Sequence, residues 1–180
     1  MAGTNAIEFE QPAVRAPTHP KMIDYQTILS PSCTRCGVAA TSKKRILEAA
    51  ADLIASTYAD IDSRALFDQL MARERLGSTG LGEGVALPHC RLAGCTQVRA
   101  AFFSLDHGLD FDASDGQQVD LMFVLVVPEE AQDTHLVVLS HLARVFGDAD
   151  ARAALRTQPD DAALFELIVS QLQSASEAAG

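Results

Sequence analysis

Residues 73–89 read RERLGSTGLGEGVALPH, and this stretch constrains the fold more than any other part of the chain. Four glycines, Gly77, Gly80, Gly82 and Gly84, fall within eight positions. Glycine allows backbone conformations in which N–H groups turn toward an anion. We therefore expect a shaped, anion-binding loop here rather than a helix or a regular strand.

Polar side chains at both ends of this stretch suit the same ligand. Ser78 and Thr79 add hydroxyl donors to the predicted phosphate loop of Gly80, Gly82 and Gly84, although they could instead only shape the turn. Arg73, one helical turn earlier, offers a bidentate guanidinium. Pro88 stiffens the backbone before His89, whose neutral imidazole is a nucleophile near pH 7. His89 is the predicted phosphoryl acceptor.

A second histidine, His135, falls in the first turn of a helix predicted from Thr134 to Phe146, with Asp133 or Thr134 as its cap. Unpaired N–H groups at a helix start favour a bound anion. The preceding strand delivers that helix start to the carboxyl edge of the sheet, where α/β proteins bind ligands. We expect His135 to face His89 across a phosphoryl group; the alternative is that it only caps its helix.

Helices and strands are predicted on both sides of residues 73–89. Ser42 is the predicted cap of a helix reaching Tyr58, and a second helix runs from near Ser63 to Gly77. The predicted strands are 85–88, 98–105 and 119–127, and further helices are expected at 149–156 and 160–172. The last strand is apolar on both faces and therefore central. The fold class is α/β: one domain with a mixed sheet flanked by helices on both faces.

Three regions are expected along the chain. Residues 1–21 contain three prolines without an apolar period and are predicted to be a disordered extension. Residues 22–174 form the predicted domain, and 175–180 a frayed tail.

Charge and composition exclude several functions. The 180 residues include 14 Lys and Arg against 24 Asp and Glu, a formal net charge of −10, which disfavours binding to nucleic acid or anionic lipid. No apolar run approaches the roughly 20 residues of a membrane span, and no signal peptide is recognisable. Four cysteines without an export signal favour reduced thiols in the cytoplasm. Cys33 and Cys36 lack a second suitable pair, so no metal is expected.

The block at 73–89, followed by DTHL at 133–136, resembles the IIA proteins of the bacterial phosphotransferase system. The similarity is to the fructose/mannitol superfamily, and within it to the nitrogen-regulatory branch. SKKR at 42–45 and VDL at 119–121 also resemble that branch, and the resemblance covers about 22–172. Cys90 departs from the pattern, because many relatives have glycine after the histidine.

This resemblance implies a mixed-sheet fold and phosphorylation of His89 by an HPr-like or NPr-like phosphocarrier. It implies that His135 stabilises the phosphoryl group and that Arg73 neutralises charge, without a metal or organic cofactor. Its regulatory targets would be potassium transporters or sensor kinases, so the chain would act as a phosphohistidine carrier rather than a conventional turnover enzyme. One alternative is a sugar-specific IIA component that passes phosphate to a IIB partner. Another is a regulatory binding module without transfer chemistry.

Overall fold

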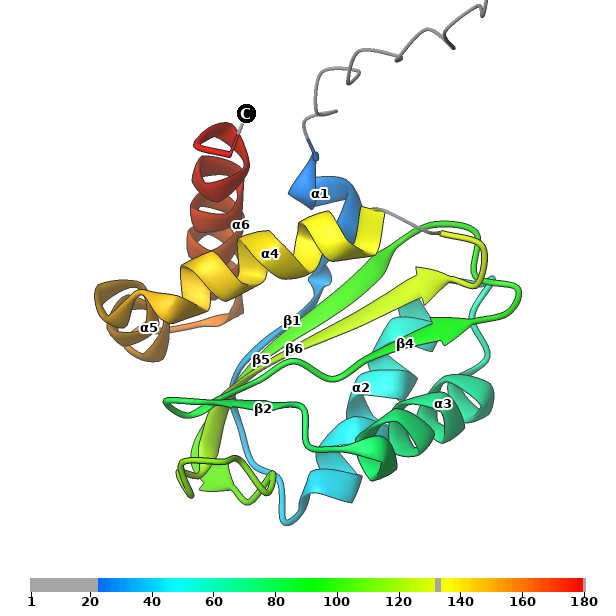
Figure 1. Ribbon diagram of the computed structural model, residues 1–180, viewed down its shortest axis with the longest axis horizontal. Helices are drawn as coiled ribbons and strands as arrows, with labels where there is room; N and C mark the ends of the chain where they lie inside the picture. Colours follow the sequence, from blue (N-terminus) through cyan, green and yellow to red (C-terminus); the bar gives the residue numbers. More distant parts are fainter. Residues whose placement is uncertain (1–22, 132–133, 180) are drawn as a thin grey trace, which may run out of the picture.

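The computed structural model describes residues 23–131 and 134–179. Its centre is a sheet with the strand order β1-β5-β6-β3-β2, in which β4 also pairs with β6 (Figure 1). The strands are β1 (Leu29–Val38), β2 (Gly80–Gly82), β3 (Val85–Ala86), β4 (His89–Leu92), β5 (Arg99–Leu109) and β6 (Val119–Pro128). β5 and β6 are antiparallel, whereas β1 runs parallel to β5, and β3 and β4 run parallel to β6. The predicted mixed sheet is confirmed.

Helices cover both faces of this sheet (Figure 1). They are α1 (Tyr25–Ile28), α2 (Lys43–Thr57), α3 (Ser63–Leu76), α4 (Thr134–Gly147), α5 (Ala149–Arg156) and α6 (Asp161–Glu177). α2 and α3 pack together on one face, and α4 crosses the other face beside α5 and α6 (Figure 1). None of the helices in the described ranges has the length and apolar composition needed to cross a membrane.

Local sequence explains the helix boundaries close to the site. The Ser42 side chain accepts a hydrogen bond from the backbone N–H of Arg45 and so caps α2, as predicted. Asp62 caps α3 in the same way through the N–H of Ala65. At its far end α3 stops at Gly77, whose φ of +158° a helix cannot continue. α3 therefore delivers the last helical residues directly to the glycine-rich segment.

An aromatic cluster fixes α4 on the sheet. Phe102 on β5 and Phe123 on β6 are cross-strand partners with ring centroids 5.8 Å apart. Phe146 on α4 lies 6.0 Å from Phe102 and 6.5 Å from Phe123. Such tilted aromatic contacts add to the free energy gained by burial. This cluster holds the helix that carries His135 against the two central strands.

The structure corrects two predictions around the glycine-rich segment. The segment was expected to hold no regular element, but Gly80–Gly82 forms β2 and pairs antiparallel with β3. His89 was expected after the end of a strand, but it is the first residue of β4 and pairs with Leu125 of β6. β3 and β4 thus lie one after the other along β6, interrupted only at Leu87 and Pro88.

Two further differences concern the ends of the domain. Residues 29–38 form the edge strand β1, which contains Cys33 and Cys36 and was not among the predicted strands. α6 continues to Glu177 and Ala175 is buried, so this part of the predicted frayed tail is helical. The predicted extension at 1–21 and the cap residue Asp133 lie outside the described residues.

Candidate functional site

A hydrogen bond to a nearby backbone carbonyl group holds the His89 ring. Its Nδ1 atom lies 2.8 Å from the carbonyl oxygen of Leu87. Because a carbonyl oxygen can only accept, Nδ1 must carry the proton and Nε2 must present its lone pair. The strand position and this bond together fix both the ring and its tautomer.

The protonation state of His89 suits a nucleophile. Burial lowers the pKa of His89 below its ordinary value of 6.5, and the positive charge of Arg73 and the neighbouring His135 ring lower it further. The bond to Leu87 and the carboxylate of Glu74 act in the opposite direction. Because the net pKa shift is downward, the imidazole is neutral near pH 7 and its Nε2 lone pair is available.

His135 lies in the first turn of α4 and lines the same pocket as His89. Its Nδ1 atom is buried and has no hydrogen-bond partner among the described residues. An unpaired buried N–H is costlier than an unpaired acceptor, so this environment favours the tautomer with the proton on Nε2. The two rings therefore offer complementary groups, a lone pair from His89 and an N–H donor from His135.

The pocket shared by these histidines has a cavity volume of about 560 Å³. Its described lining contains two histidines and two arginines but no Asp or Glu, although the chain as a whole carries a net charge of −10. The lining residues are Gln69, Ala72, Arg73, Leu76, His89, Cys90, Arg91, Val127, His135, Leu136 and Leu139. A concave site that excludes acidic residues in an acidic protein is suited to an anion.

Arg73 takes the position predicted for it, whereas Arg75 does not line the pocket. Nη1 of Arg73 donates to the carbonyl oxygen of Gly77 at 2.9 Å, which ties the guanidinium to the end of α3. The structure thereby distinguishes two arginines that the sequence places only two positions apart.

The predicted phosphate loop occupies a different place. The hydroxyl of Thr79 donates to the Glu74 carboxylate, and that of Ser78 donates to the carbonyl oxygen of Phe111. Neither these side chains nor Gly80, Gly82 and Gly84 line the pocket of His89. Their contacts give the segment a structural role, and phosphate binding by them stays a prediction without support from this geometry.

Gly84 shows what this structural role requires. Its φ is +78°, and a Cβ atom there would lie 2.5 Å from Nη2 of Arg156 and 2.8 Å from Oδ1 of Asp120. Arg156 pairs with Asp120 at 2.9 Å and donates to the carbonyl oxygen of Glu83 at 2.6 Å. The missing side chain at Gly84 thus lets α5 bind the glycine-rich hairpin at close range.

Among the lining residues that were not identified as site residues from the sequence, three bear on function. Arg91 lies two positions after His89 on β4, so strand alternation places both on the same face. That signal was available only once 89–92 was known to be a strand. Leu76 and Leu136, which are 86% and 59% exposed, form an apolar rim from α3 and α4. Exposed apolar side chains beside a reactive pocket are typical of a protein-docking surface.

The thiols and the other histidines add no second reactive group to this site. Cys33 is buried in β1, and in the described ranges no three His, Cys, Asp or Glu side chains are placed to hold a metal ion. Burial raises the pKa of the Cys90 thiol to about 12, which keeps it protonated beside His89. His141 is 5% exposed and bonds to Tyr25, on a different side of α4 from His135.

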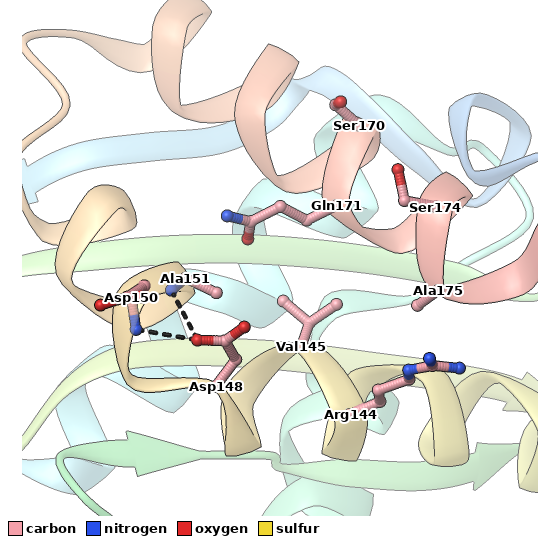
Figure 2. Close-up of a pocket in the computed structure, with 9 residues that line it drawn as sticks. All are labelled: Arg144, Val145, Asp148, Asp150, Ala151, Ser170, Gln171, Ser174 and Ala175. Atoms are coloured by element: carbon pink, nitrogen blue, oxygen red, sulfur yellow. Dashed lines mark hydrogen bonds between the residues drawn. The ribbon is translucent and has the colours of Figure 1, made fainter. Parts of the chain in front are cut away.

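A second hollow, of about 470 Å³, lies between α4, α5 and α6 (Figure 2). Arg144, Asp148 and Gln171 are among the side chains that line it, but no histidine or cysteine does. Figure 2 shows the Asp148 carboxylate turned toward the N–H groups of Asp150 and Ala151, where it caps α5. With no histidine or cysteine among its described lining residues and with Asp148 engaged in capping, this hollow lacks the chemistry of the His89 pocket.

An α/β domain with a mixed sheet, in which two histidines and two arginines line one pocket, belongs to a class of proteins suited to holding an anion beside a neutral imidazole. The chain belongs to the family described as phosphoenolpyruvate-dependent sugar phosphotransferase system, EIIA 2, which matches residues 27–171.

Known relatives place it more narrowly within this family. It is 46% identical over 148 residues to a nitrogen regulatory protein of Pseudomonas aeruginosa, covering 82% of this chain and 96% of that protein. The crystal structure of nitrogen regulatory protein IIA-Ntr from Neisseria meningitidis is 40% identical, with a TM-score of 0.75, and the match covers 82% of this chain and 98% of that one. The resemblance to nitrogen-regulatory IIA proteins is confirmed.

The fold is shared more widely. The crystal structure of IIA mannitol from Escherichia coli has a TM-score of 0.61 at 18% identity, and the match covers 73% of this chain and 92% of that chain. This likeness supports the predicted fold class and nothing finer.

Proposed function

We propose that this chain is a phosphoryl carrier and regulator of the nitrogen-type phosphotransferase system, and that Nε2 of His89 accepts the phosphoryl group. The observation that carries this proposal is the bond between His89 Nδ1 and the Leu87 carbonyl oxygen, because it leaves Nε2 unprotonated at the pocket. The similarity to nitrogen regulatory proteins supports the regulatory part.

The transfer follows from the geometry of the two rings. The lone pair on His89 Nε2 attacks the phosphorus of a phosphohistidine on the donor protein, and the donor's P–N bond breaks with its electron pair returning to the donor imidazole. The transition state is loose and places charge on the peripheral oxygens, where Arg73 and His135 Nε2–H supply donors. Positive charge that develops on the His89 ring is stabilised at Nδ1–H by the Leu87 carbonyl dipole.

The proposed donor is an HPr-like or NPr-like phosphocarrier, which also implies a cytoplasmic location. The apolar rim of Leu76 and Leu136 supports protein docking at this pocket. Phosphorylation adds close to two negative charges at pH 7. The regulatory targets, potassium transporters or sensor kinases, would distinguish the two states of the protein by that charge.

The test is incubation with phosphoenolpyruvate, the first enzyme of the phosphotransferase system and its phosphocarrier. We expect wild-type protein to gain the mass of one acid-labile phosphoryl group. His89→Ala should gain none, and His107→Ala, which changes an exposed histidine outside the pocket, should behave as wild type. Labelling of His89→Ala, or no labelling of wild type, would refute the proposal.

A sugar-specific IIA component is the alternative, and the fold shared with IIA mannitol is compatible with it. Rapid transfer from the phosphorylated chain to a sugar-type IIB domain would favour this alternative. Retention of the group, together with phosphorylation-dependent binding to a regulatory target, would favour the nitrogen-type role. Equal binding by wild type and His89→Ala would instead indicate a module that does not use transfer.

A further inference from the structure

Arg91 is the one lining arginine to which no role has yet been given. It lies on β4 opposite Val127 of β6, two residues after His89. Two residues along a strand span about 6.6 Å and point to the same face. Both side chains line the pocket, so the Arg91 guanidinium shares the cavity in which the group on His89 would lie.

The two arginines of the pocket are anchored alike. Nη1 of Arg91 donates to the carbonyl oxygen of Glu129 at 2.8 Å, and Nη1 of Arg73 donates to that of Gly77 at 2.9 Å. A carbonyl fixes the position of a guanidinium without neutralising it. Within the described ranges, neither arginine forms a salt bridge to a carboxylate, whereas Arg35, Arg45, Arg64, Arg152 and Arg156 do. The pocket thus has two positioned positive charges that form no salt bridge with a described carboxylate.

The two arginines lie at different depths in the pocket. Arg73 is half-buried and, after burial itself, is the first of the causes that lower the pKa of His89. Arg91 is exposed and is not among those causes, so its charge acts on the His89 ring more weakly. Arg91 therefore belongs to the outer part of the pocket, on the side from which a phosphorylated partner must approach.

We propose that Arg91 is a second phosphoryl-binding arginine, which engages the peripheral oxygens of the incoming group while it is still attached to the donor and holds them during transfer. This inference rests on the proposed phosphoryl transfer to His89. A planar guanidinium with one nitrogen anchored keeps further N–H donors for phosphoryl oxygens. Arg73 would then act mainly on the bound group and Arg91 mainly on its capture.

The competing role for Arg91 is purely structural. By bonding to the Glu129 carbonyl, it links β4 to the segment between β6 and α4, and α4 carries His135. A strut of this kind needs an N–H donor but no charge. Glutamine retains an amide donor and loses the charge, whereas lysine retains the charge, so the two substitutions separate the two roles.

The experiment compares phosphoryl uptake from the phosphorylated carrier by Arg91→Gln, Arg91→Lys and Arg75→Gln. Arg75 is an exposed arginine in the last turn of α3 that does not line the pocket, so it controls for the loss of one positive charge. We expect Arg91→Gln to slow uptake roughly 10- to 100-fold, the worth of a hydrogen bond to a charged group. Arg91→Lys should recover part of the rate, and the salt dependence of uptake should weaken in Arg91→Gln.

Two outcomes would overturn the inference. One is uptake by Arg91→Gln at the rate of Arg75→Gln. The other is loss of uptake in Arg91→Lys as large as in Arg91→Gln, accompanied by changed NMR signals of the His135 ring, which would indicate a strut. The spontaneous lifetime of the phosphohistidine should change less in Arg91→Gln than in Arg73→Gln, and the reverse order would also contradict the assignment.

A failure of the proposed function can be distinguished from a failure of the Arg91 inference. If wild type takes up no phosphoryl group, the carrier role is refuted and Arg91 is judged by titration with inorganic phosphate, with the His89 and His135 ring signals as the readout. Weaker phosphate binding by Arg91→Gln than by Arg75→Gln then supports anion binding by Arg91, and equal binding refutes it.

Discussion

The hydroxyl of Thr79 donates a 2.6 Å hydrogen bond to Oε2 of Glu74, whose carboxylate is buried. The backbone N–H of Thr79 points to the same carboxylate, and Nζ of Lys43 lies 3.3 Å from its other oxygen. A hydroxyl used in this way is not available to a phosphate. The hydrogen bond therefore gives Thr79 a structural role, in which it donates to a buried carboxylate.

Thr79→Val should therefore lower the free energy of unfolding by about 1–3 kcal/mol, because the Glu74 carboxylate loses a donor that water cannot replace. Urea unfolding followed by circular dichroism measures this. Phosphoryl uptake per folded molecule should remain within about twofold of wild type, a difference of about 0.4 kcal/mol. Unchanged stability with lost uptake would return Thr79 to the phosphate-binding role predicted from the sequence.

Gly84→Ala should destabilise the protein more than Gly94→Ala. Both glycines have a positive φ, +78° and +83°, so each substitution carries a backbone cost of roughly 1–2 kcal/mol. A methyl group at Gly84 additionally collides with Arg156 and Asp120, whereas nothing lies within 4 Å of one at Gly94. The excess should be about 1–3 kcal/mol, the usual cost of overpacking, and equal thermal unfolding of the two variants would contradict the close approach.

Tyr25→Phe tests the attachment of α1 to α4. The Tyr25 hydroxyl lies 2.6 Å from Nδ1 of His141, and both side chains are buried. Removing the hydroxyl should cost about 0.5–1.5 kcal/mol at pH 7.5 in urea unfolding. A variant as stable as wild type would show that this hydrogen bond contributes no net stability.

The ring of His89 should titrate below pH 6.5. Burial first, and then the charge of Arg73 and the neighbouring His135 ring, lower its pKa from that ordinary value. Below pH 6.5 the unfolded chain binds the proton more readily than the folded one, so this residue costs stability as the pH falls through the folded pKa. NMR titration of the imidazole signals checks this directly, and a midpoint at or above 6.5 would contradict the buried, neutral state.

Cys90 should resist alkylation in the native protein. Its thiol is buried and its pKa is raised to about 12 by that burial, so little thiolate exists at pH 8. Mass spectrometry of iodoacetamide-treated protein should show modification of Cys90 only after denaturation. Rapid native modification would instead reveal a reactive thiol beside His89.

Much of the fold was predictable because its signals are local. The caps and apolar faces of α2 and α3, the doubly apolar β6 and the exact range of α5 are each encoded within a few residues. β1 was missed for a physical reason: Pro31 and Gly37 interrupt it and its burial does not alternate. An edge strand tolerates such residues because only one side must pair.

The site was predictable only in part. Arg73, His89 and His135 were identified by the types and spacing of nearby residues, and the structure brings all three to one pocket. Arg91 escaped detection because its place depends on β4, a strand of four residues after a proline that becomes regular only by pairing with β6. The partner of the Ser78 hydroxyl in the structure, Phe111, is distant in sequence and could not be foreseen, so the phosphate-binding role of Ser78 and Thr79 stays a prediction.

One consequence follows from the position of His89 inside the sheet rather than in a loop. Its backbone neighbours are already tied to β6, with Leu125 N–H donating to the Pro88 carbonyl oxygen at 2.9 Å. We therefore expect that adding a group to the imidazole leaves the surrounding backbone in place. A target that distinguishes the phosphorylated from the unphosphorylated protein would then respond to the charge at the site and not to a change of shape. Its binding should therefore depend on ionic strength and not on a slow conformational change.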